Sequence, residues 1–273
     1  MAMTQKIRPD LSGVPETMLW PLWNRAAEAR RIGGLLDDPL SVDLVRRIDY
    51  PFFRKFGVPT PYLAIRARYV DGLIQNFLQK AHDNPVVIAL GEGLETQLWR
   101  IGAEDTPWIS VDLPESIAVR QRLLPSSDMQ TFVPGSAFDE AWMDFVPSGA
   151  TPFISAAGLL MYFEEKDVRK LLTMVASRFP GATLFFDAIP PAFSIASWNG
   201  VYVTQNYRAP RMPWGIRIRD IPGFVRSIPG CRLLSSRTYG EAFPFRTPIG
   251  SGVSRLPGIR GRVSPSLNLI KFD

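Results

Sequence analysis

A chain of 273 residues with 46% hydrophobic and 21% charged side chains can bury a sizeable core and is too apolar to be intrinsically disordered. One cysteine, Cys231, and one histidine, His82, exclude an internal disulfide and argue against a metal site or a histidine-based triad. No apolar run approaches the roughly 18 residues that a membrane helix requires. The amino terminus also lacks the apolar region of a secretory signal, so we expect a cytoplasmic protein without a membrane partner.

The formal net charge of +5 is concentrated late in the chain. Between residues 189 and 265, eleven arginines stand against only Asp220 and Glu241. These arginines are scattered and form no module in which basic and aromatic residues alternate. We therefore predict a solvated surface or a pocket for an anionic small molecule, and no nucleic-acid partner.

The amino-terminal part reads as helical. Apolar residues recur at helical spacing over residues 15–49, and Asp38 followed by proline is a sound helix start. Residues 51–61 form a proline-broken aromatic connection, and 62–81 read as a long helix. We predict a helical cap over residues 1–84.

The remainder alternates between strands and helices, which predicts an α/β fold: a doubly wound, mostly parallel seven-stranded sheet. The first five strands are predicted at 86–90, 108–111, 129–133, 152–156 and 182–187, with helices at about 95–101, 114–124, 139–145 and 164–179. A helix at 217–228 and a hairpin-like strand pair at 232–238 and 266–272 follow. The core domain would span 85–273, with a substrate-side insertion at about 189–230.

One local pattern points to a ligand. The apolar run Val86–Leu90 ends at Gly91 and Gly93, and a second short apolar run ends in Asp112 about twenty residues later. This is the spacing of a nucleotide-binding βαβ unit, in which glycines admit the ligand to the backbone and the acid accepts ribose hydroxyls. The third glycine of the dinucleotide motif is missing, which favours a nucleoside. A tight turn followed by a helix-capping aspartate is the alternative.

Three segments in order carry a family resemblance: Leu90-Gly-Glu-Gly-Leu-Glu-Thr96, Val111-Asp-Leu-Pro-Glu115 and Gly158-Leu-Leu-Met-Tyr162. Over roughly residues 13–190 the chain resembles the class I methyltransferases of the leucine carboxyl methyltransferase type, especially the branch named for tetracenomycin polyketide O-methyltransferase. The resemblance implies a Rossmann-like fold, S-adenosylmethionine as cofactor and O-methylation of a small carboxylate or polyketide-like phenol in secondary metabolism. It does not indicate an oligomeric state.

The resemblance also implies site residues. An arginine on the last cap helix would bind the cofactor carboxylate; it maps to Arg66, with Arg68 as its competitor, and the first cap helix would supply Arg25. The cofactor-binding candidates are Arg25, Arg66, Gly91, Gly93, Asp112, Leu113, Ser136, Ala137 and Ala157.

The chain departs from the family pattern at Ala157, where many relatives carry a glutamate near the cofactor's amino group. Recognition of that ammonium would be weakened unless Glu92 or Glu95 replaces the lost carboxylate. The change could instead mark another use of the same cofactor, such as an intramolecular displacement. A binding protein without catalytic activity is a third reading, because fold alone does not decide function.

Methyl transfer asks mainly for alignment and exclusion of water, although a phenol would benefit from a general base. Tyr162 and Asp187 are the catalytic candidates, since they follow the fourth and fifth strands. Aromatic residues after the fifth strand would wall a hydrophobic acceptor, and Arg217 or Arg219 could orient a negative group on it.

Overall fold

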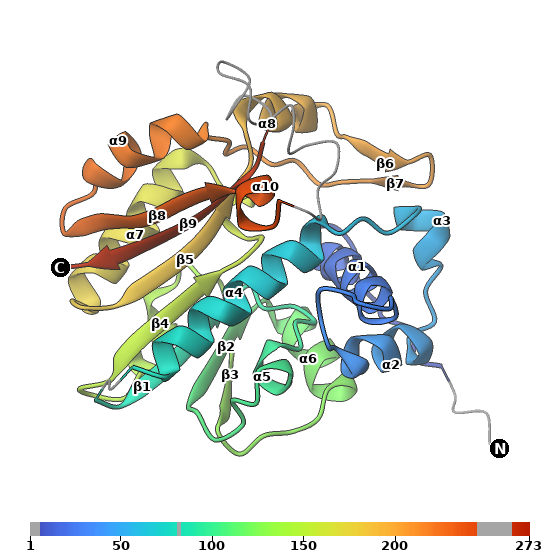
Figure 1. Cartoon of the computed structure of the whole chain (residues 1–273), viewed down its shortest axis with the longest axis horizontal. Helices are drawn as coiled ribbons and strands as arrows, with labels where there is room; N and C mark the ends of the chain where they lie inside the picture. Colours follow the sequence, from blue (N-terminus) through green and yellow to red (C-terminus); the bar gives the residue numbers. More distant parts are fainter. Residues whose placement is uncertain (1–5, 81–82, 245–263) are drawn as a thin grey trace.

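The computed structural model describes residues 6–80, 83–244 and 264–273, and its centre is a seven-stranded sheet (Figure 1). The strand order is β3-β2-β1-β4-β5-β9-β8. Strands β1 to β5 run parallel, whereas β9 lies antiparallel between β5 and β8. The strands span Pro85–Leu90 (β1), Trp108–Asp112 (β2), Gln130–Pro134 (β3), Thr151–Ala156 (β4), Thr183–Ala188 (β5), Cys231–Thr238 (β8) and Ser266–Phe272 (β9). The predicted fold class and all seven predicted strands are confirmed.

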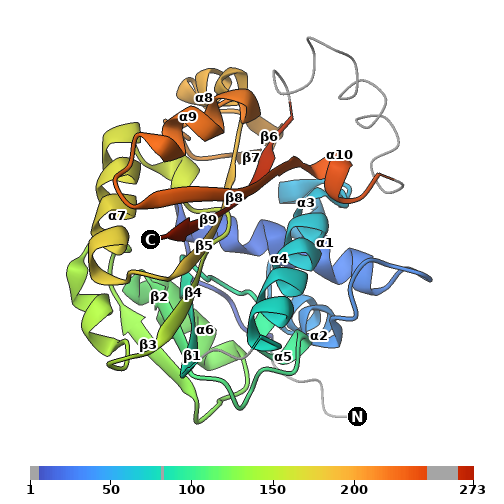
Figure 2. The ribbon, with the colours of Figure 1, turned by 60° about the vertical axis from the view of Figure 1, so that its left-hand side comes forward.

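The central strands are apolar at nearly every position because helices cover both faces of the sheet. On one face, Val87 and Ala89 of β1 pack with α4 (Tyr62–Leu78) and α5 (Gln97–Arg100). On the other face, Val86 and Ile88 pack with η2 (Glu140–Phe145), α7 (Glu165–Arg178) and α9 (Ile221–Arg226). Figure 2 shows α7 and α9 on one side of the sheet and α4 and α5 on the other. The remaining core helix, α6 (Pro114–Leu123), begins with the proline expected at its first turn.

Before the sheet, four short helices and α4 form the cap. They are η1 (Pro15–Met18), α1 (Leu19–Ala29), α2 (Pro39–Arg47) and α3 (Phe52–Phe56). Asp38 caps α2 as expected, because its Oδ1 accepts a hydrogen bond from the backbone N–H of Ser41 at 3.0 Å. The predicted boundary at residue 84 falls directly before β1.

The insertion after β5 folds onto the cap. It contains α8 (Pro191–Trp198) and the hairpin of β6 (Tyr202–Thr204) and β7 (Tyr207–Arg208). Tyr207 lies in one hydrophobic cluster with Phe52 and Phe56 of α3, and its ring meets that of Phe56 edge-on at 4.8 Å. The cap and the insertion therefore bury apolar surface against each other.

One local prediction was wrong, and two predicted helices are present but differ in type or extent. The connection at 51–61 contains the helix α3, and the helix expected at 139–145 is the 3-10 helix η2. The helix expected at 217–228 is split into η4 (Ile218–Asp220) and α9, with a proline at the start of α9. These pieces are short, and tertiary packing outweighs local propensity in such segments.

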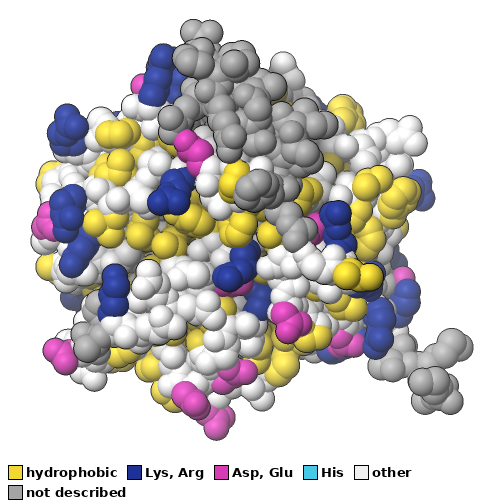
Figure 3. All heavy atoms as spheres, in the orientation of Figure 1, with side chains coloured by type: hydrophobic (Ala, Val, Ile, Leu, Met, Phe, Trp, Pro, Cys, Tyr) yellow, Lys and Arg dark blue, Asp and Glu magenta, His cyan; other side chains and the backbone are white. Residues whose placement is uncertain are grey.

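The surface shows no single basic patch on the face drawn in Figure 3, where Lys and Arg side chains lie dispersed among acidic and apolar groups. Within the described ranges, none of the helices is long and apolar enough to span a bilayer. His82 and four of the eleven late arginines lie outside the described residues.

Candidate functional site

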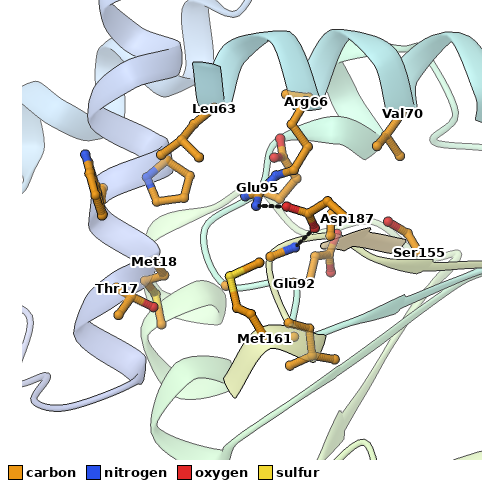
Figure 4. Close-up of a pocket in the computed structure, with 18 of the residues that line it drawn as sticks. Thr17, Met18, Leu63, Arg66, Val70, Glu92, Glu95, Ser155, Met161 and Asp187 are labelled. Carbon is orange, nitrogen blue, oxygen red and sulfur yellow. Dashed lines mark hydrogen bonds and ion pairs between the residues drawn. The ribbon is translucent and has the colours of Figure 1, made fainter. Parts of the chain in front are cut away.

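A cavity of about 610 Å³ opens at the carboxyl ends of β1, β2, β4 and β5, under the cap. Its volume is within the range of roughly 300–1,000 Å³ that small-molecule sites occupy. Figure 4 shows Thr17 and Met18 reaching it from the cap, Leu63 and Arg66 from α4, and Asp187 from the sheet. Parallel sheets of this kind bind their ligands at this edge.

The turn after β1 has the backbone that the glycine pattern predicts. Gly91 and Gly93 line the cavity with φ of 64° and 52°, in the left-handed region. A Cβ atom on Gly91 would stand 2.7 Å from Cδ1 of Leu159, and one on Gly93 would stand 2.8 Å from Cβ of Met18. The left-handed backbone favours glycine at both positions, and at Gly93 the cap also packs directly on the turn.

Asp112 lies beside this turn at the end of β2. Its Oδ2 accepts from the backbone N–H of Gly93 and its Oδ1 accepts from that of Leu113, each at 2.7 Å. Burial raises the pKa of Asp112 against the opposing effect of these hydrogen bonds. The side chain of Ser116 also hydrogen-bonds to Asp112. A carboxylate offers about four acceptor sites, so one remains for a ligand.

A buried ion pair also lines the cavity. Nη1 of Arg66 contacts Oδ2 of Asp187 at 3.0 Å, and the backbone N–H of Gly158 donates to Oδ1 of Asp187 at 2.5 Å (Figure 4). The hydroxyl of Tyr239 donates to the same Oδ2 at 3.3 Å. Burial by itself would lower the pKa of Arg66, but the charge and hydrogen bond of Asp187, together with Tyr239 and Glu95, outweigh it and raise that pKa. Arg68, the other candidate for binding the cofactor carboxylate, is exposed and does not line the cavity.

The rest of the cavity is largely apolar and comes from segments far apart in the sequence. Tyr162 of η3 (Leu160–Tyr162) lines it as expected. Sequence reasoning missed most of its neighbours, which are Thr17, Met18, Trp20, Leu63, Met161, Ile189, Met212 and Tyr239. Among the aromatics expected as walls, Phe193 lines the cavity, whereas Trp214 is buried in the core under α9. Burial raises the pKa of Tyr162, so its phenol stays protonated.

The model of the leucine carboxyl methyltransferase family matches residues 19–176. The chain belongs to this family. It is 32% identical over 260 residues to the tetracenomycin polyketide synthesis O-methyltransferase TcmP of Streptomyces glaucescens, covering 92% of this chain and 94% of that protein. It is 27% identical over 186 residues to the S-adenosyl-L-methionine-dependent methyltransferase dpfgK of Gibberella zeae, covering 62% of each.

A crystal structure of a methyltransferase from Thermobifida fusca YX superimposes with a TM-score of 0.58 at 11% identity, covering 100% of this chain and 97% of that one, which supports the fold. Together with the family match, these relatives identify the chain as a methyltransferase that uses S-adenosylmethionine.

Arg25, the second arginine that the family resemblance implies, makes different contacts from Arg66. It lines the cavity, but its guanidinium contacts Oδ2 of Asp38 at 3.4 Å, Oε2 of Glu95 at 3.0 Å and the carbonyl oxygen of Leu94 at 2.6 Å. Burial by itself would raise the pKa of Glu95, but Arg100 and Arg25 outweigh it and lower that pKa to about 2. Arg25 thus ties the cap to the cofactor turn, and the geometry gives less support to direct cofactor binding.

Glu92 is held beneath the turn. Its carboxylate accepts from the indole N–H of Trp108 at 3.0 Å and from the hydroxyl of Ser110, and it pairs with Arg120 at 2.9 Å. Burial raises the pKa of Glu92, and these partners oppose that rise. Because Glu92 and Glu95 are both engaged by arginines, neither is positioned as a free replacement for the carboxylate that the family carries at Ala157.

The structure separates two predicted residues from the cavity. Ser136 is exposed and Ala137 is buried in the core, where its carbonyl accepts from the indole N–H of Trp142 at 3.0 Å. Neither lines the cavity, in contrast to Ala157 and Leu113, which do. The reason is topological: β3 is the edge strand, so the chain leaving it lies to one side of the ligand edge.

Arg217 and Arg219 also lie elsewhere. They line a separate surface groove, where both pair with Asp220, at 2.5 and 3.7 Å. Their side chains are 41% and 59% exposed, as expected of solvated residues.

Proposed function

We propose that this enzyme transfers the methyl group of S-adenosylmethionine to an oxygen of a small hydrophobic acceptor, such as a polyketide-like phenol or carboxylate. The observation that carries the proposal is the lining of the cavity, which combines polar groups (Asp112, Arg66 and Asp187) with apolar residues from the cap, the loop after β4 and the insertion. The 32% identity to an O-methyltransferase of tetracenomycin polyketide synthesis, over nearly the full length of both chains, supports oxygen as the acceptor atom.

The polar groups suit the cofactor. Asp112 retains an acceptor site for a ribose hydroxyl, and Gly91 and Gly93 line the cavity beside it. Arg66 presents a planar guanidinium at the cavity wall, which matches a carboxylate in shape and charge. These residues would hold the ribose and the amino-acid end of the molecule.

When bound, the cofactor supplies a methyl group on a sulfonium; the C–O bond to the acceptor forms as the C–S bond breaks, and the bonding electron pair goes to sulfur. The protein's part is alignment and exclusion of water. Met18 closes on the glycine turn from the cap, and Met161, Ile189 and Met212 keep the rest of the cavity dry.

Neither catalytic candidate has the setting of a free base. The phenol of Tyr162 stays protonated, and the carboxylate of Asp187 is held by three donors. We propose that Tyr162 donates a hydrogen bond that orients the acceptor, and that a phenolic acceptor loses its proton to bulk solvent as it enters the cavity. Tyr162→Phe should then lower kcat about tenfold, the worth of one hydrogen bond, and leave the affinity for S-adenosylhomocysteine unchanged. Tyr202→Phe, at an exposed position, is the matched control. A Tyr162→Phe enzyme with the kcat of the control would remove this role.

The cavity favours an acceptor with an uncharged body. Among the described residues, Arg25 and Arg66 are the only arginines that line the cavity, no lysine does, and both arginines are paired with carboxylates. An anionic group away from the reacting oxygen would therefore find no free cation there.

A cytoplasmic location of the protein is a separate prediction, which fractionation of source cells would test.

Product analysis tests the proposed function. The enzyme is incubated with S-adenosylmethionine and a panel of hydroxylated polycyclic aromatic acids, their amides and their decarboxylated phenols. We expect S-adenosylhomocysteine and an acceptor heavier by one methylene unit, with the methyl on oxygen by NMR. Release of methylthioadenosine would indicate an intramolecular displacement instead. Binding of the cofactor without consumption, across an extract of the source organism as well, would indicate a non-catalytic protein.

A further inference from the structure

The Arg66–Asp187 pair is a buried ion pair that faces a ligand cavity. Arg66 is 8% exposed and Asp187 is 3% exposed, yet both line the cavity. They come from unconnected elements, α4 of the cap and the end of β5, so the pair exists only in the folded chain. A buried pair of this kind loses much of its hydration, and additional hydrogen bonds must compensate for that loss.

The backbone around the pair is shaped to admit it. Gly158 has φ of 74°, and a Cβ atom there would stand 2.5 Å from Nη1 of Arg66. The absence of a side chain at Gly158 lets the guanidinium lie against the loop after β4. The same loop provides the N–H that holds Oδ1 of Asp187, and its preceding residue, Ala157, adds no charge to the cavity wall.

Asp187 differs from the other carboxylates that line the cavity. Glu92 and Glu95 are neutralised from behind by Arg120 and by Arg25 with Arg100, and Asp112 fixes the glycine turn. Asp187 receives three hydrogen bonds, from Arg66, Gly158 and Tyr239, whereas a carboxylate has about four acceptor sites. Among the described residues only Gly158 donates to Oδ1, so one acceptor site is left on that oxygen. Burial raises the pKa of Tyr239 well above its usual value, so its hydroxyl remains a hydrogen-bond donor to Asp187.

We propose that Asp187 binds the α-ammonium group of the cofactor, next to the α-carboxylate on Arg66. The inference rests on the proposed function and replaces the role of general base for Asp187. A guanidinium alone attracts a carboxylate but repels the ammonium one carbon away. A cation and an anion held side by side match both charges of an α-amino acid. Asp187 thereby supplies, from β5, the negative charge that Ala157 lacks.

The first test needs only the wild-type protein. Calorimetry compares two 5′-thioadenosines without a carboxylate, one with an S-(3-aminopropyl) chain and one with an S-propyl chain. If Asp187 binds the ammonium, the amine should bind at least fivefold more tightly than the uncharged analogue. If Arg66 dominates and Asp187 only neutralises it, the amine should bind equally well or more weakly, which would overturn the proposal.

The second test is a thermodynamic cycle that combines removal of the ligand's amino group with substitution of Asp187 or Arg66. Binding of S-adenosylhomocysteine and of its analogue without the amino group is measured for wild type, Asp187→Asn and Arg66→Lys, with thermal unfolding as a folding check. We expect Asp187→Asn to weaken S-adenosylhomocysteine at least tenfold and the deaminated analogue much less. Arg66→Lys should weaken both ligands alike, since both keep the carboxylate.

The outcomes are distinguishable from failure of the proposed function. Equal weakening of both ligands by Asp187→Asn would show that Asp187 only positions Arg66, and the proposal would be wrong while cofactor binding stood. Failure of wild-type protein to bind S-adenosylhomocysteine would instead remove the proposed function. If Asp187→Asn does not fold, the wild-type comparison of amine and uncharged analogue decides.

Discussion

Replacing Gly93 by alanine should separate the cofactor turn from the cap. The new Cβ atom would lie 2.8 Å from Cβ of Met18 in η1, and this atom cannot swing aside like the end of a long side chain. Gly93 also has φ of 52°, which alanine adopts only with strain. Gly102 has φ of 66° and nothing within 4 Å of its Cβ position, so Gly102→Ala carries the strain alone.

The two variants therefore differ by one steric overlap, which is the contact of the new Cβ atom at position 93 with Met18. The backbone strain costs about 1–2 kcal/mol of unfolding free energy at either position. At Gly93, displacement of Met18 adds about 1–3 kcal/mol, the usual cost of overpacking. Gly93→Ala should thus lose about 2–5 kcal/mol in total. It should also bind S-adenosylhomocysteine at least tenfold more weakly, because the N–H of Gly93 that anchors Asp112 shifts with the turn.

Urea unfolding measures the first effect and calorimetry the second. Gly102→Ala should show only the smaller loss of stability and an unchanged affinity, at the same m-value. The reasoning is refuted if the two variants are equally stable and bind the ligand equally well, since the contact between η1 and the turn would then have no energetic weight.

Three further predictions follow from the site. Asp112→Ala should weaken S-adenosylhomocysteine by about 1.5–3 kcal/mol, as calorimetry would show, because hydrogen bonds to a charged acceptor are lost; unchanged affinity in a folded variant would exclude Asp112. Glu95→Gln should be less stable than wild type by about 3 kcal/mol near neutral pH. That difference should vanish as pH falls from 4.5 towards 2, because the carboxylate's folded-state pKa is lowered to about 2; a constant difference in denaturation across this range would contradict the pairing with Arg25. Arg217→Ala and Arg219→Ala should leave turnover of acidic acceptors unchanged, and a rise in KM for acids alone would restore the anionic-acceptor idea.

The sequence by itself determined the sheet and the part of the site at the ends of β1 and β2. Most of the parallel strands are short apolar runs, and Gly91, Gly93 and Asp112 stand at or just after strand ends. Because the carboxyl ends of neighbouring parallel strands meet at one edge, local pattern was enough to bring these residues together. The same rule failed for Ser136, since strand order was not visible and β3 proved to be the edge strand.

Only the tertiary structure decided the partners of the charged groups and the apolar walls of the cavity. Arg66 and Asp187 are 121 residues apart, and Tyr239 is a further 52 residues along the chain. The hydrophobic periodicity of the sequence does not reveal such contacts. They depend on how α4 crosses the sheet and on where α10 (Tyr239–Ala242) follows β8. The docking of Tyr207 on α3 was likewise not predictable, since aromatic packing between distant segments depends on shape complementarity that the residue pattern does not encode.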